Sequence, residues 1–239
     1  MSSPEACFLQ MSTMLPLVKV VEIGYELCGS FALSPSNSRG FCTHEAPTSV
    51  ESLRRYVAKS DGVSGAKRAR RALNYLIDGA ASPMEAALVL LLCLPTSLGG
   101  YGLALPRLNY GIEVPVRSGS SSRRVRYRCD LYWPESKLAV EYDSDMFHTG
   151  SKRIAGDAAK RTNLAHVGVT VVSVTRSQIF DARRFDEAAV LLAKRLGGRI
   201  RSQRKDLLTK RYELRTLLFA GNPTQEESWA EGPRLYVDF

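Results

Sequence analysis

The sequence predicts an α/β protein in which a mixed sheet is flanked by helices and preceded by a mostly helical N-terminal subdomain. Polar and apolar residues alternate in two runs, 125–133 and 137–143, around a turn at Pro134, as expected for a β-hairpin. Apolar residues recur at helical spacing through much of the chain before residue 95. A short β-branched run at 169–174 follows a segment with a helical pattern and adds a strand to the sheet.

The N-terminal subdomain, residues 1–80, is expected to consist mainly of helices. Ser3 and Pro4 can begin a helix that Pro16 ends or kinks. Residues 17–23 are rich in β-branched side chains, so the sequence leaves both helix and strand open there. The other expected elements are a loop rich in Ser, Gly, Pro and Asn over 30–47 and helices with basic outer faces over 49–58 and 65–78.

The α/β domain, residues 81–198, is expected to begin with a capped helix. Ser82 is a natural N-cap, Pro83 suits the first helical position, and Glu85 completes a capping box. The apolar run at 86–94 is too short to span a bilayer, and it predicts a buried helix.

The rest of the chain alternates between strand and helix signals. The expected elements are a loop at 95–106, a strand at 110–116, a basic turn at 117–124, the hairpin, a helix at 154–167, a strand at 169–174 that is buried on both sides, and a helix that Ser177 caps and that runs to 196. A last basic helix at 199–219 and an irregular tail make up the C-terminal segment, residues 199–239.

The hairpin carries the chemistry that the sequence suggests. In its first strand Val125, Tyr127, Cys129, Leu131 and Trp133 are expected to share one apolar face. The register centred on the turn sets Asp130 opposite Glu141, and Arg128 opposite Asp143. Opposed side chains are roughly 5 Å apart at Cβ, so two carboxylates there repel unless a proton or cation lies between them. Mg²⁺ binds through one or two carboxylates together with substrate phosphates. The alternative is a surface hairpin whose carboxylates pair with arginines.

Charge favours a polyanionic partner. The net charge of +9 and the pI near 9.5 favour nucleic acid over a membrane surface as the partner. The alternative is that the charge serves solubility alone. The basic residues are clustered at 54–71, 117–128 and 194–215. The five cysteines show no CxxC spacing, and no signal peptide is visible, so we expect a reducing cytoplasm, no disulfide framework and no membrane association.

Several separate motifs resemble one family. Four segments follow each other in the order seen in small endonucleases related to very-short-patch-repair nucleases. They are Ser82 to Glu85, Cys129 to Pro134, Lys137 to Asp143 with His148, and Asp157 to Thr175. That group belongs to the PD-(D/E)XK superfamily. The resemblance covers roughly 40% of the chain. It implies a restriction-endonuclease-like core and Mg²⁺-dependent hydrolysis of DNA, with Mn²⁺ as a substitute and no small-molecule cofactor.

The resemblance also suggests roles for individual residues. It implies that Asp130 and Glu141 are metal ligands, and that Glu85 is a third ligand, although the capping box explains Glu85 equally well. The Glu-x-Lys of the superfamily is Glu141-Tyr142-Asp143 here, so the usual lysine is absent. Lys160 or Arg161 can supply the missing cation, and the family motif favours Arg161.

The remaining candidates have simpler alternatives. Asp143 is a third ligand or the partner of Arg128, and Arg161 otherwise forms a helix-surface pair with Asp157. His148 is a general base, a phosphate contact or merely an exposed loop residue. The predicted contacts to the nucleic-acid backbone are Arg126, Arg128, Lys160, Arg201, Arg204 and Lys205.

The first half of the chain also resembles a second family. Ser3 to Glu5, the apolar segment 9–21, and residues 65–72 are similar to the C-terminal region of AbiE-class type IV antitoxins. The winged helix-turn-helix of those proteins is not expected here, so promoter binding is not carried over. The alternative to an endonuclease is therefore a non-catalytic nucleic-acid-binding or antitoxin-type regulator, with a cognate toxin as a possible partner. A structural protein with a basic surface ranks last.

Overall fold

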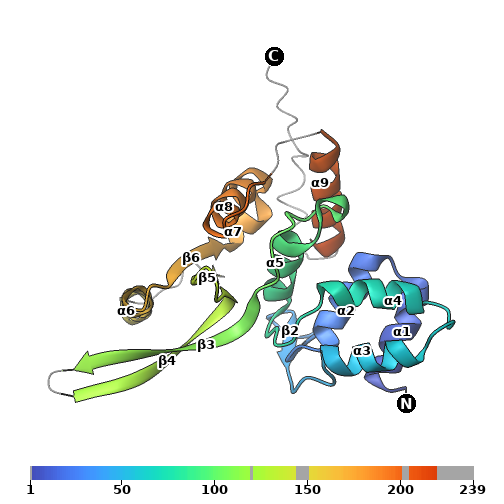
Figure 1. Cartoon of the computed structure of the whole chain (residues 1–239), viewed down its shortest axis with the longest axis horizontal. Helices are drawn as coiled ribbons and strands as arrows, with labels where there is room; N and C mark the ends of the chain where they lie inside the picture. The colour runs from blue at the N-terminus through green and yellow to red at the C-terminus, as the bar shows by residue number, and fades with distance from the viewer. Residues whose placement is uncertain (1, 119–120, 144–150, 201–204, 220–239) are drawn as a thin grey trace.

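The N-terminal third of the protein is a group of helices (Figure 1). The computed structural model describes residues 2–118, 121–143, 151–200 and 205–219. The elements before the sheet are α1 (Pro4–Met14), α2 (Leu17–Leu27), β1 (Phe31–Leu33), β2 (Phe41–Thr43), α3 (Val50–Lys59), α4 (Ala66–Ala72), η1 (Leu73–Tyr75), α5 (Pro83–Cys93) and η2 (Thr96–Leu98). The caps predicted at Ser3 and Ser82 are confirmed, and Ser49 caps α3.

The structure refines three expectations for this region. The segment left open at 17–23 is helical, because Val18, Val21 and Tyr25 recur at helical spacing and all three are buried. The loop expected over 30–47 contains a short antiparallel hairpin, with Phe31 paired to Thr43. The helix expected over 65–78 is shorter, since it ends as a 3-10 turn at Tyr75.

The α/β half contains a four-stranded mixed sheet with strand order β3-β4-β5-β6. Its elements are β3 (Arg107–Ser118), β4 (Ser121–Trp133), β5 (Leu138–Asp143), α6 (Ser151–His166), β6 (Thr170–Thr175), α7 (Arg176–Phe180), α8 (Ala182–Arg195) and α9 (Lys205–Phe219). Strands β3, β4 and β5 are antiparallel neighbours, and β6 joins β5 in parallel. The predicted fold class, a mixed sheet flanked by helices with a helical N-terminal region, is confirmed.

The hairpin register predicted from the turn is confirmed where the strands pair. Leu131 lies opposite Val140, and Trp133 lies opposite Leu138. Continuing that register by one residue places Asp130 opposite Glu141. The β4–β5 ladder ends at Leu131, so the predicted pairing of Arg128 with Asp143 is not part of it.

The prediction that one apolar face runs along β4 is wrong, because the strand changes faces at Asp130. Cys129 packs in a small hydrophobic cluster with Leu164 of α6, whereas Leu131 belongs to the main core on the other face. Asn109, at the corresponding position of β3, has a left-handed backbone with φ 48°. A left-handed residue within a strand breaks the regular alternation of side chains, and the change of faces occurs at this position.

Helices cover both faces of the sheet. On one face, Leu164 of α6 packs with Cys129, Tyr132 and Ala139. On the other, α5 and α8 pack against Leu131 and Val140 in the main core. Strand β6 lies at the edge and only Val174 is fully buried, so the expectation that β6 is buried on both sides is wrong.

The helix expected from Ser177 to 196 is two helices. Thr175 caps α7 through a capping box with Gln178, and Asp181 caps α8 by accepting from the N–H groups of Arg183 and Arg184. Both cap residues have short side chains whose oxygen accepts from N–H groups in the first turn of the helix, as is usual for N-caps. Sequence reasoning chose Ser177 and missed the break at Asp181.

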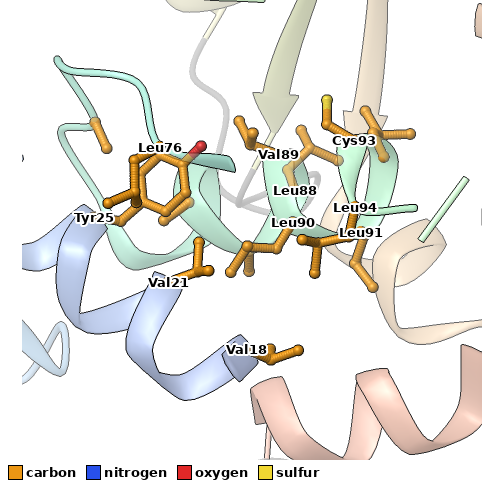
Figure 2. Close-up of a cluster of buried hydrophobic side chains, with 14 of the residues drawn as sticks. Val18, Val21, Tyr25, Leu76, Leu88, Val89, Leu90, Leu91, Cys93 and Leu94 are labelled. Atoms are coloured by element: carbon orange, nitrogen blue, oxygen red, sulfur yellow. The ribbon is translucent and has the colours of Figure 1, made fainter. Parts of the chain in front are cut away.

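Helix α5 forms the centre of the molecule. Every residue from Glu85 to Cys93 is buried, as its uniformly apolar composition predicts. Figure 2 shows Leu88, Leu90 and Leu91 of α5 packed near Val21 and Tyr25 of α2. One continuous hydrophobic cluster therefore joins the helical N-terminal region to the sheet. Among the described residues, no helix has the length and apolarity needed to cross a membrane.

Helix α9 turns two of its arginines inward. Arg211 and Arg215 are 8% and 2% exposed, and their guanidinium groups stack on Tyr101 and Phe185. Burial lowers the pKa of Arg215 to about 10, so it is still charged at neutral pH. Asp186 of α8 lies 3.3 Å from Arg211 and also accepts from the Tyr101 hydroxyl. Part of the basic C-terminal stretch is therefore structural.

We expect Asp186→Ala to destabilise the protein by about 2–4 kcal/mol, because it removes the carboxylate paired with the buried guanidinium of Arg211 and the larger of two carboxylate charges that act on Arg215. Urea unfolding followed by circular dichroism measures the change. The matched control is Glu187→Ala, which removes an exposed carboxylate 3.7 Å from Arg183 and is expected to cost less than about 0.5 kcal/mol. Equal losses in the two variants would contradict the structural role of Asp186.

Candidate functional site

Three charged side chains converge where β4 changes faces. Asp130 comes from β4, Glu141 from β5 and Lys160 from α6. The hairpin register sets the two carboxylates side by side, and the Lys160 Nζ lies 2.8 Å from the Glu141 Oε1. Both Lys160 and Glu141 are about one-fifth exposed, so the group is accessible from one side. We call Asp130, Glu141 and Lys160 the acid–lysine cluster.

The two carboxylates are held in place by the backbone and by the lysine. The Asp130 Oδ2 accepts a hydrogen bond from the N–H of Tyr142 at 2.8 Å, which ties β4 to β5 just beyond the end of their ladder. Burial raises the pKa of Asp130, and the charges of Lys160 and Arg128 oppose that shift only partly. Burial also raises the pKa of Glu141, with Lys160 lowering it and Asp130 raising it further. One ammonium therefore faces two carboxylates, which leaves a net negative charge.

Lys160 reaches the cluster because of its position on α6. Leu164, one turn further along the same face, is fully buried against the sheet and fixes the rotation of the helix. The Lys160 Nζ also donates to the backbone carbonyl of Arg128 at 2.6 Å, so the lysine bridges both strands. Arg161 is the next residue and lies about 100° further around the helix, where it is exposed. The geometry does not support the preference for Arg161.

Glu85 lies beside the cluster but is held within its own helix cap. It is 7% exposed, and its oxygens accept from the N–H of Ala81 at 2.9 Å and the hydroxyl of Ser82 at 3.0 Å. Burial raises the pKa of Glu85, and the charge of Asp130 contributes to that rise. The Ser82 cap is therefore confirmed, but Glu85 returns to the N–H of Ala81 and the hydroxyl of Ser82, where a capping box uses the N–H of the cap residue, and its two oxygens are already engaged.

Asn109 is a site residue that sequence reasoning missed. Its Nδ2 donates to Glu85 at 2.6 Å and to the carbonyl of Gly79 at 2.8 Å, which fixes the orientation of the amide. Its Oδ1 is buried and has no hydrogen-bond partner among the described residues. The left-handed backbone of Asn109 is common for asparagine, but nothing in the sequence distinguishes this asparagine from any other.

The other candidates lie outside the cluster or outside the described residues. Asp143 lies on β5, paired with Thr175 of β6. Arg126 and Arg128 are exposed on β4. His148, Arg201 and Arg204 lie outside the described residues, and the side chain of Lys205, the first residue of α9, is not described.

The oxygen atoms of this site suit a hard cation. Asp130 and Glu141 provide two adjacent carboxylates, and the unpartnered Oδ1 of Asn109 lies on the neighbouring strand. Burial raises the pKa of the Cys129 thiol to about 12, which keeps it protonated and unsuited to bind a soft metal. Within the described ranges, no three His, Cys, Asp or Glu side chains form a ligand group. Asp130 and Glu141 are therefore the candidate ligands, whereas both oxygens of Glu85 already accept hydrogen bonds at its helix cap.

Comparison with known proteins gives two similar curated sequences. The chain is 30% identical over 128 residues to Uncharacterized protein MT2308 of Mycobacterium tuberculosis (strain CDC 1551 / Oshkosh), and to the same extent to Uncharacterized protein Rv2248 of Mycobacterium tuberculosis (strain ATCC 25618 / H37Rv). The match covers 54% of this chain and 41% of each relative, so it spans about two-fifths of their length. No family model and no solved structure matches the chain.

Proposed function

We propose that this protein is a divalent-metal-dependent endonuclease that hydrolyses phosphodiester bonds in DNA, of the very-short-patch-repair-like group. The observation that carries the proposal is the acid–lysine cluster. Two carboxylates and one lysine are the groups that the resemblance implies. Asp143 occupies the position of the lysine in the usual Glu-x-Lys motif, but the Lys160 Nζ lies 2.8 Å from Glu141. Lysine from the following helix thus replaces the missing strand lysine.

Each member of the cluster has a task in such a reaction. A cation held by Asp130 and Glu141 would polarise the phosphate and lower the pKa of a bound water. Lys160 holds Glu141 in position through a hydrogen bond. Its ammonium group would also donate a hydrogen bond to the phosphate oxygens as negative charge develops on them. The burial that raises both carboxyl pKa values also strengthens every charge interaction at this site.

The test is cleavage of DNA by the purified protein. We expect supercoiled plasmid and linear duplex to be nicked or cut with Mg²⁺ or Mn²⁺, and to stay intact with EDTA. Glu141→Gln is expected to lower the rate at least about 100-fold, because it removes one metal-ligand charge and the partner of Lys160. Glu187→Gln, at an exposed carboxylate 3.7 Å from Arg183, is the matched control and is expected to keep full activity.

Failure of the wild type to cleave any single- or double-stranded DNA with either metal would overturn the proposal. The second candidate is a regulator that keeps this fold without catalysis, such as an antitoxin-type protein with a toxin partner. One observation favours it: Glu85 is saturated by its cap, and the Lys160 ion pair already partly neutralises the site. DNA binding that survives EDTA, without any cleavage, would support this candidate.

A further inference from the structure

The longest feature of the sheet is a two-stranded ribbon formed by β3 and β4. The two strands pair from Arg107 with Tyr132 to Ser118 with Ser121. Twelve residues at about 3.3 Å each give a ribbon roughly 40 Å long. Figure 1 shows that it extends away from the helical part of the molecule. Since β5 pairs with β4 only over residues 131–133, most of the ribbon has no third strand beside it.

The two faces of the ribbon differ in chemistry. One face carries Ile112, Val114 and Tyr127, which pack in the small cluster under α6. The hydroxyl of Tyr127 accepts from Asn163 of α6 at 2.7 Å, which anchors this face. The opposite face presents three exposed arginines at alternate positions of β4: Arg124, Arg126 and Arg128. We call these three residues the arginine face.

The arginine face is shaped by the neighbouring strand. A Cβ on Gly111 would lie 2.0 Å from the Nε of Arg126, so the absence of a side chain leaves room for that guanidinium to lie across the ribbon. Arg124 is paired with Glu113 at 3.3 Å, and both side chains are largely exposed. Such a pair contributes little and is readily exchanged for a phosphate. The net charge of the face is positive.

The arginine face ends beside the acid–lysine cluster. The backbone carbonyl of Arg128 accepts from the Lys160 Nζ at 2.6 Å. Asp130 is two residues beyond Arg128 on the same strand. A polyanion lying along these arginines therefore ends within two residues of Asp130, at the point where β4 changes faces.

We infer that the arginine face binds the backbone of double-stranded DNA and directs it to the acid–lysine cluster, an assignment that rests on the proposed function for its choice of substrate. Guanidinium groups are permanently charged planar donors that match phosphate oxygens. A two-stranded ribbon also has dimensions that the major groove of B-DNA accepts. The face supplies phosphate contacts, which position the duplex without reading its sequence.

The test measures DNA binding without catalysis. The variant Arg124→Gln/Arg126→Gln/Arg128→Gln is titrated into a fluorescently labelled 30-base-pair duplex in EDTA, over a series of KCl concentrations. We expect at least about 10-fold weaker binding than wild type, with the slope of log K against log[KCl] reduced by about 2–3, since each phosphate contact contributes about 0.9. An unchanged thermal midpoint shows that the variant is folded.

The matched control removes the same charge elsewhere. Lys194, Arg195 and Arg199 are all exposed near the end of α8, and replacing the three with Gln lowers the net charge equally. We expect this control to keep the salt slope of the wild type. Equal weakening in both variants would show that net charge alone matters and would overturn the inference. The inference would also be overturned if the wild type binds no duplex, or if it binds only an acidic protein. Wild type that binds through the arginine face but never cleaves would instead refute the proposed function and leave the inference intact.

Discussion

Lys160→Met is expected to reduce metal-dependent DNA cleavage by about 10²–10⁴-fold, whereas Arg161→Met is expected to leave the rate within about threefold of wild type. The two residues are adjacent and both are basic. Lys160 contacts a carboxylate, with its Nζ 2.8 Å from Glu141, whereas Arg161 is exposed on another face of α6. Removing its ammonium leaves two partly buried carboxylates without the lysine charge between them. In the proposed reaction it also removes the side-chain donor to the phosphate.

Cleavage rates of both variants over a range of Mg²⁺ concentrations separate the possible roles of Lys160. If Lys160 only holds Glu141, excess metal will restore part of the rate, because the cation can orient the carboxylate in its place. If Lys160 acts on the phosphate, the rate stays low at saturating metal. A larger loss in Arg161→Met than in Lys160→Met would refute our placement of the cation.

Asp130→Asn is expected to abolish metal-dependent cleavage and yet to raise the thermal midpoint by a few degrees at pH 7–8. Because burial raises the pKa of Asp130, the folded protein binds more protons than the unfolded chain between the ordinary carboxyl pKa and the raised one. Stability from this group is therefore present at low pH and is lost as the pH rises through the folded pKa. An asparagine carries no charge to bury, and its amide oxygen can still accept from the N–H of Tyr142.

Thermal unfolding of wild type and Asp130→Asn at pH values from 4 to 8 checks this sign. The difference in midpoint is expected to be smallest near pH 4 and to widen as the pH rises. Added Mn²⁺ is expected to stabilise the wild type in proportion to its occupancy and to have little effect on the variant. A variant less stable than wild type at pH 8 without metal would show that Lys160 and Arg128 outweigh the burial cost of Asp130.

Signals between neighbouring residues account for most of the local structure around the site. The turn at Pro134 and the alternation on both sides of it set the register that places Asp130 beside Glu141. Ser82 determined the start of α5, because its hydroxyl accepts from the N–H of Glu85 three positions along the chain. Such features follow from neighbours along the chain, and they were therefore predictable.

The identity of the cation in the cluster and the point where the strand changes faces depend on long-range packing. Lys160 and Arg161 are equivalent in sequence, and the burial of Leu164 against the sheet determines which of them faces the carboxylates. Asn109 lies next to Glu85 because β3 brings it there, 24 residues away along the chain. Contacts of this kind depend on how helices rotate and strands twist during packing, which residue spacing alone does not specify.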